Sequence, residues 1–121
     1  MNAKYLLIAA LLMASFSTQA HEAKGPNGGR ITDAGPYHIE MVEKSGIIDI
    51  FISDAKDKPV SSSGFKGTAI LVVEGKSQRI VLEPVDSARL TGKATATLPN
   101  QPKGVVQLTA PDGATAQGKF N

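Results

Sequence analysis

The sequence predicts an all-β protein with antiparallel strands. Short runs of alternating apolar and polar residues recur about every ten residues, and turn signals of glycine, proline, asparagine or aspartate separate them. No window of ten or more residues after position 20 carries a helical stripe of apolar side chains. Seven or eight strands in about 100 residues predict a small antiparallel β-sandwich of immunoglobulin-like type, with a small β-barrel as the alternative.

The first twenty residues have the three parts of a secretory signal peptide. Lys4 supplies the positive charge, Tyr5–Met13 (YLLIAALLM) the apolar core, and Thr18-Gln19-Ala20 the small-residue cleavage pattern. The apolar run is shorter than a membrane-spanning helix requires. We therefore expect residues 1–20 to be removed, leaving an exported chain that begins at His21.

A polar segment precedes the first expected strand. Residues 21–29 (HEAKGPNGG) contain three glycines and a proline, which predicts a flexible N-terminal arm. Residues 30–121 are expected to form a single domain, because the strand rhythm continues without a linker. The first strand is expected at Arg30–Thr32, followed by a turn at Asp33–Pro36 in which Asp33 is a turn former, and then by a strand at Tyr37–Val42 (YHIEMV).

The remaining elements follow the same rhythm. Ile47–Ser53 (IIDIFIS) is the strongest predicted strand, because β-branched residues dominate it. Arg89–Leu98 also alternates, although its apolar side chains are mostly small. Two hairpins with glycine-containing turns are expected, one joining Thr68–Val73 to Gln78–Glu83 and the other joining Gly104–Ala110 to Thr115–Phe120.

Composition excludes several classes of function. The chain has no cysteine, which excludes disulfides, thiolate metal sites and a lipid-modified N-terminal cysteine. Met41 is the only methionine after position 20, so a methionine-rich Cu(I) carrier is not expected. The formal net charge of +2 comes without any block of Lys or Arg, which argues against nucleic acid as a partner. No acid–histidine–serine arrangement is visible, and we expect no enzymatic activity.

The two histidines are the candidate metal ligands. As a new N-terminus, His21 would offer both its α-amine and its imidazole to one ion. His38 and Glu40 are two residues apart in a strand, so both should point to the sheet face opposite the core residues Ile39 and Met41. Amine, imidazole and carboxylate groups suit Cu²⁺ or Zn²⁺. The alternative is that His38 is a half-exposed strand residue without a ligand.

The metal-site hypothesis depends on the path of the arm. An arm running straight on from the first strand would carry His21 away from His38 at about 3.3 Å per residue. Gly25–Gly29 (GPNGG) is a segment that can reverse the chain, because glycine and asparagine tolerate positive φ. The site requires this reversal.

Three segments resemble a known β-sandwich module, namely Gly25-Pro26-Asn27-Gly28-Gly29-Arg30-Ile31, Tyr37-His38-Ile39-Glu40, and IDIFISD with Lys58-Pro59. The module is similar to one in the periplasmic adaptor (membrane-fusion) subunits of heavy-metal efflux pumps of the resistance–nodulation–division type. Those adaptors commonly have Gly-Pro-His-Gly-Gly-Arg, whereas Asn27 stands here at the histidine position and removes one potential ligand. The resemblance implies a Gram-negative periplasm and a role in metal homeostasis or efflux.

Together these features predict a non-enzymatic periplasmic protein that binds Cu²⁺ or Zn²⁺ through His21 and His38, with Glu40 as a further candidate ligand. The alternative is a metal-free interaction module. Such a module would dock to an efflux adaptor or to another envelope protein through a sheet edge or face.

Overall fold

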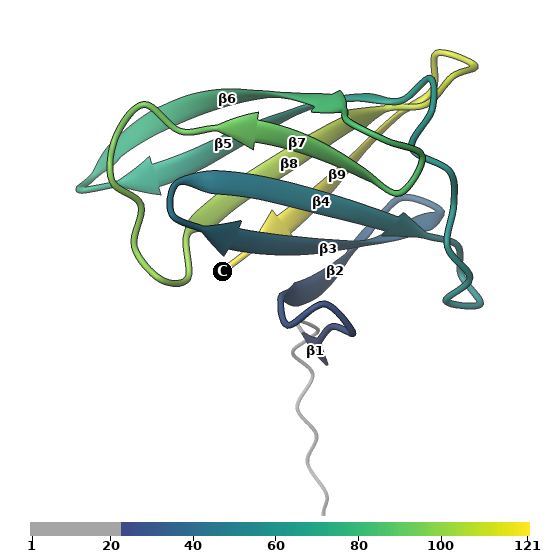
Figure 1. The fold of residues 1–121 in the computed structure, drawn as a ribbon, viewed down its shortest axis with the longest axis horizontal. Helices are drawn as coiled ribbons and strands as arrows, with labels where there is room; N and C mark the ends of the chain where they lie inside the picture. Colours follow the sequence, from purple (N-terminus) through teal and green to yellow (C-terminus); the bar gives the residue numbers. More distant parts are fainter. Residues whose placement is uncertain (1–22) are drawn as a thin grey trace, which may run out of the picture.

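The computed structural model describes residues 23–121, which form a closed antiparallel β-barrel (Figure 1). The eight wall strands are β2 (Arg30–Ala34), β3 (Tyr37–Lys44), β4 (Ile47–Ser53), β5 (Lys66–Val73), β6 (Lys76–Pro84), β7 (Arg89–Lys93), β8 (Lys103–Thr109) and β9 (Thr115–Phe120). Their order around the wall is β2-β3-β4-β7-β6-β5-β8-β9, and β2 pairs with β9 to close it. A short strand, β1 (Ala23–Lys24), pairs with the start of β2.

The all-β prediction is confirmed, but the immunoglobulin-like sandwich is wrong and the small barrel is the correct alternative. The pairing of Ala34 in β2 with Gly118 in β9 joins two edges that a sandwich would leave open. Inward and outward residues alternate along the strands of both architectures. The period-2 pattern therefore could not separate one from the other.

Strands β5, β6 and β7 form a meander inserted between β4 and β8 in reverse order. Two long connections are needed for this arrangement, residues 54–65 before β5 and residues 94–102 after β7. The predicted strand Arg89–Leu98 is accordingly too long. It ends at Lys93, and Leu98 in the connection is buried with the core.

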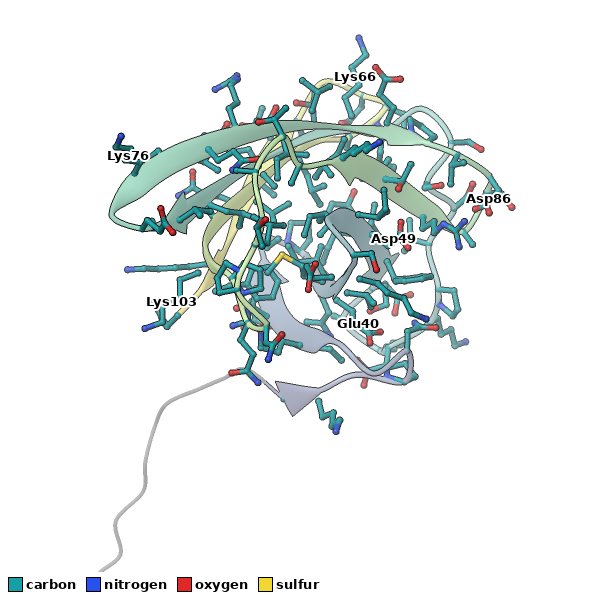
Figure 2. All side chains as sticks on the ribbon, turned by 60° about the vertical axis from the view of Figure 1, so that its left-hand side comes forward. Glu40, Asp49, Lys66, Lys76, Asp86 and Lys103 are labelled. Carbon is teal, nitrogen blue, oxygen red and sulfur yellow. The ribbon has the colours of Figure 1, made fainter. Side chains whose placement is uncertain are left out.

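The barrel interior is filled by apolar side chains (Figure 2). Strand β4 shows the alternation clearly, since Ile48, Ile50 and Ile52 are buried and the residues between them are partly exposed. The completely or almost completely buried side chains include Ile39, Met41, Leu71, Ile80, Leu82, Leu90, Val106, Leu108 and Phe120. Charged side chains such as Lys66, Lys76 and Lys103 point away from the barrel (Figure 2). Polar groups with a chemical role are therefore to be sought on the outer face.

The β2–β3 turn is tighter than predicted. It consists of Gly35 and Pro36 alone, and Gly35 has φ 59°, as the first central residue of a type II′ hairpin turn requires. Strand β2 therefore continues through Ala34, and Asp33 is a strand residue paired with His38. The turn predicted at Asp33–Pro36 is therefore two residues too long, and the role of Asp33 as a turn former is wrong.

The barrel wall has a seam at the start of β2. There β1 pairs with Arg30 and Ile31, while β9 pairs on the same edge only at Ala34. The guanidinium of Arg30 reaches across the seam, donating to the carbonyl oxygens of Pro102 and, at 3.3 Å, of Asn121. It also lies 5.4 Å from the centre of the Phe120 ring. Arg30 thus closes the wall where strand pairing stops.

Candidate functional site

A groove of about 920 Å³ lies on the outer face of β2, β3 and β4. Ile31, Glu40 and Phe51 contribute to its floor from these three strands. The N-terminal segment borders it through Ala23, Pro26 and Asn27. The loop after β4 and the β6–β7 turn contribute further lining residues, namely Asp57, Pro59, Val60, Ser61, Ser87 and Ala88. His38 and Asp33 line the same groove. It therefore combines apolar side chains, such as Ile31 and Phe51, with a few convergent polar groups, a common form of binding site.

The chain reverses at the GPNGG segment, as the metal-site hypothesis requires. The Gly25 N–H donates to the carbonyl oxygen of Gly29 at 2.8 Å, which closes the loop. Strand β1 consequently runs antiparallel to β2, with Ala23 opposite Ile31. His21 lies outside the described residues, but Ala23, two residues further along the chain, lines the groove.

Two glycines of this segment allow close packing on β3. A Cβ atom on Gly25 would lie 2.2 Å from Cδ of Glu40, and one on Gly29 would lie 2.2 Å from the carbonyl oxygen of Met41. Neither approach leaves room for a side chain. Close packing of this loop on β3 is therefore enough to explain why glycine stands at these two positions of the Gly25–Gly29 segment.

Glu40 holds the loop against the barrel. Its carboxylate accepts hydrogen bonds from the backbone N–H groups of Asn27 (2.9 Å) and Gly29 (2.8 Å) and from Nδ2 of Asn27 (2.9 Å). The residue is only 4% exposed. Glu40 does lie on the outer face with His38, as the alternation predicted. Both of its oxygens are occupied by N–H donors, so a metal ion at Glu40 would have to displace the loop.

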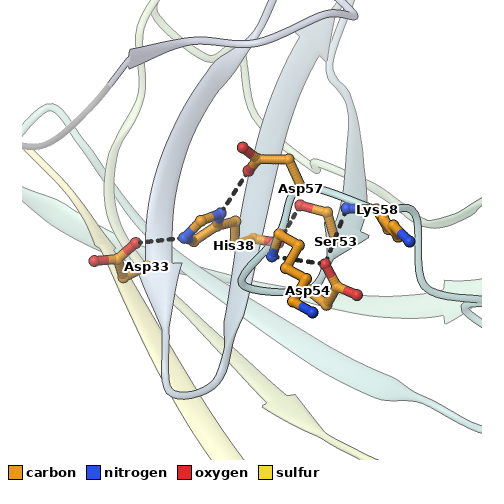
Figure 3. A network of polar contacts seen from close by, with 7 residues as sticks. Asp33, His38, Ser53, Asp54, Asp57 and Lys58 are labelled. Atoms are coloured by element: carbon orange, nitrogen blue, oxygen red, sulfur yellow. Dashed lines mark hydrogen bonds and ion pairs between the residues drawn. The ribbon is translucent and has the colours of Figure 1, made fainter.

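His38 lies between two aspartates (Figure 3). Its Nδ1 atom is 2.8 Å from Oδ1 of Asp57, and its Nε2 atom is 3.3 Å from Oδ1 of Asp33. An ionised carboxylate only accepts hydrogen bonds, so a proton on Nδ1 would be donated in a hydrogen bond to Asp57, and a proton on Nε2 would face Asp33. The His38 side chain is 29% exposed and both aspartates are 79% exposed. The Nε2 side of the ring therefore faces a carboxylate that solvent can reach.

A compact loop presents Asp57 to the ring. The Asp54 carboxylate accepts hydrogen bonds from the backbone N–H groups of Lys56 (2.8 Å) and Lys58 (2.9 Å). Asp57 itself has φ 65°, a left-handed conformation that aspartate tolerates better than most residues. Its side chain points back toward His38 (Figure 3). Sequence reasoning missed this contact because it depends on how the loop folds over β3.

The described residues alone do not complete a metal site. No three His, Cys, Asp or Glu side chains within residues 23–121 are arranged to hold one ion. Asp33 and Asp57 approach opposite nitrogens of the ring, so a single ion on His38 can contact only one of them. His38 with one aspartate supplies two ligands. Further ligands would have to come from outside the described part of the chain or from solvent.

Comparison with protein-family models, curated proteins and solved structures found no match for this chain. In residues 23–121 no helix has the length and apolar character that crossing a membrane demands.

Proposed function

We propose that this chain is an exported, non-enzymatic protein that binds a divalent metal, Cu²⁺ or Zn²⁺, at His38. The arrangement of the imidazole carries the proposal, since Nδ1 is fixed by Asp57 and Nε2 faces Asp33 in an open groove. A histidine that binds a metal through one ring nitrogen usually donates the other N–H to a carboxylate or carbonyl. The Asp57 contact has that form.

The path of the N-terminal segment supports His21 as the second source of nitrogen ligands. Ala23 and His38 line the same groove. Two residues of extended chain span at most about 7 Å, so in this proposal His21 comes from a chain position two residues before a groove-lining residue. If the leader is cut after Ala20, the amine and imidazole of His21 add two ligands to the one from His38.

The resemblance to efflux adaptors supports a periplasmic setting and a role in metal homeostasis or efflux. Asn27 stands at the position of the adaptor histidine. It donates two hydrogen bonds to the Glu40 carboxylate, which hold the N-terminal loop against β3. In this proposal the metal is therefore bound at the His38 end of the groove, and Asn27 is not a ligand.

The second candidate is a metal-free docking module for an efflux adaptor or another envelope protein. It is favoured by the apolar floor of the groove and by β1, which is the end strand of the sheet. An extended segment of a partner could pair with such an edge. This candidate requires neither a free amine at His21 nor the imidazole of His38.

Titration of the processed protein with Zn²⁺ and Cu²⁺ tests the two candidates. Metal binding through both histidines predicts that His38→Ala weakens affinity and that one glycine added before His21 weakens it as well. The addition moves the free amine off the chelating residue while keeping its imidazole. Equal weak binding by the native, His38→Ala and glycine-extended forms would contradict the metal-binding proposal and favour docking.

A further inference from the structure

We infer that the outer side of β6, β5, β8 and β9 docks the protein on an anionic phospholipid surface. These four strands are consecutive neighbours in the barrel wall, so their outward side chains form one continuous face. We call it the basic face. It lies on other strands than the groove, which is built on β2, β3 and β4, and the inference is therefore independent of metal binding at His38.

Strand register defines the central row of the basic face. Ile70 in β5 pairs with Arg79 in β6 on one side and with Val105 in β8 on the other, and Val105 pairs with Lys119 in β9. Directly paired residues share a sheet face. Because neighbours in the chain such as Leu71 are buried in the core, this row points outward. Two cations therefore flank two aliphatic side chains across the full width of the face.

Charge is distributed unequally around the wall. Strands β5, β6, β8 and β9 carry five basic residues and one acidic residue, namely Lys66, Lys76, Arg79, Lys103 and Lys119 against Glu83. The other four wall strands carry four of each sign, namely Arg30, Lys44, Arg89 and Lys93 against Asp33, Glu40, Glu43 and Asp49. The positive charge of the strands thus lies on one side of the barrel.

The cations of the basic face are available to a partner. All five are exposed, and none takes part in an ion pair within residues 23–121. Figure 2 shows Lys66, Lys76 and Lys103 extending from the barrel into solvent. An anionic partner can therefore approach them without displacing an internal carboxylate.

The spacing of the cations requires an extended partner. Neighbouring strands are about 4.8 Å apart, so the backbone positions of Arg79 and Lys119, three strands apart, are separated by about 14 Å. Charges spread in this way do not converge on one small anion. A surface that repeats negative charge over a wide area fits them better.

Two further features favour a membrane over an acidic protein segment. Val72 and Val81 lie on the basic face with exposed fractions of 46% and 59%, and they are two of the three large exposed hydrophobic residues in the described part of the chain. Cations together with aliphatic side chains are what binding to the headgroup boundary of an anionic bilayer uses. Strands β5 and β8 are paired on both sides, so they offer no free edge to an added strand.

The experiment measures binding of the processed chain to vesicles by co-sedimentation. The native protein should bind vesicles of phosphatidylcholine with about one third phosphatidylglycerol, and should not bind pure phosphatidylcholine. Raising NaCl from about 0.05 M to about 0.5 M should abolish binding, because salt screens exposed charges. Each Lys or Arg near such a surface contributes about fivefold to binding, so Arg79→Gln, Lys103→Gln and Lys119→Gln combined should weaken it by roughly tenfold to a hundredfold.

A matched control separates the basic face from net charge. Lys44→Gln, Lys58→Gln and Lys93→Gln combined remove the same three charges from exposed positions outside the basic face and should weaken binding less than about threefold. Circular dichroism should show the native β spectrum for both triple variants. Equal losses in the two would overturn the inference, because net charge alone would then explain binding.

A fluorescent label locates the contact directly. The chain has no cysteine, so an environment-sensitive dye can be attached at one introduced thiol. The dye on Gln107→Cys, an outward position of β8, should shift to the blue with anionic vesicles, whereas the dye on Ala55→Cys in the loop after β4 should not. The reverse pattern would overturn the assignment to this face. Binding to soluble polyglutamate without binding to anionic vesicles would overturn the lipid surface in favour of an acidic protein.

Discussion

Replacing Glu40 with alanine should release the N-terminal loop and lower stability. The change removes three hydrogen bonds, two from Asn27 and one from Gly29, to a carboxylate that is 4% exposed. Each such bond contributes about 1 kcal/mol net, and somewhat more when the acceptor is charged. The donors can turn to water once the loop leaves, which limits the loss. We expect a decrease in unfolding free energy of about 3–4 kcal/mol.

Thermal and urea unfolding followed by circular dichroism would measure this loss. For a domain of this size, 1 kcal/mol corresponds to about 4–8 °C in Tm, so Glu40→Ala should melt roughly 12–32 °C lower. Glu40→Gln retains one acceptor oxygen and should cost about half as much. Glu83→Ala, an exposed glutamate on β6, is the control and should stay within about 0.5 kcal/mol of the native protein.

The same variant distinguishes a loop-holding glutamate from a metal ligand. Native stability in Glu40→Ala, together with a large loss of metal affinity, would refute this reasoning and restore Glu40 as a ligand. Faster hydrogen exchange at the amides of Asn27 and Gly29, with exchange in β4 unchanged, would support it.

Four other outcomes are expected. Ile50→Asp puts a charge into the fully buried core and should cost several kcal/mol, enough to abolish the cooperative melting transition. Gly92→Ala should cost about 1–3 kcal/mol in urea unfolding, because its Cβ would lie 2.4 Å from the carbonyl oxygen of Val81. Intact mass of periplasmic material should show a chain that begins at His21, and any other start would remove the terminal amine as a ligand. Lowering the pH from about 7.5 to about 5.5 should weaken Zn²⁺ binding in a titration, because protons compete with the metal for imidazole nitrogen.

The sequence predicted the parts of the fold that depend on neighbouring residues. Strand β4 was evident from its isoleucines, and the β5–β6 and β8–β9 hairpins from their glycine-containing turns. Barrel closure depends on contacts between residues far apart in the sequence, such as the pairing of Ala34 with Gly118 and the contacts of Arg30 with Pro102 and Phe120. No local pattern encodes those contacts, which is why the sandwich was predicted instead.

For the candidate site, too, the sequence predicted only what depends on neighbouring residues. Alternation placed His38 on the outer face of β3 correctly. The partnership with Asp33 required the turn to be two residues long, and the glycine–proline pair at 35–36 was the signal for it. The contact with Asp57 and the burial of Glu40 depend on loops that fold over the strand from elsewhere in the sequence, so period-2 reasoning could not reach them.

Alternate residues of strand β3 face opposite sides of the barrel wall. Ile39 and Met41 face the filled interior, and His38 and Glu40 face the groove. A substitution at the outward, partly exposed His38 can therefore change the chemistry of the groove while leaving the core side chains in place. A single-residue insertion or deletion between Tyr37 and Met41 would instead exchange the two faces, burying an imidazole and exposing an isoleucine. The number of residues in this strand is therefore constrained more tightly than the residue type at an outward position such as His38.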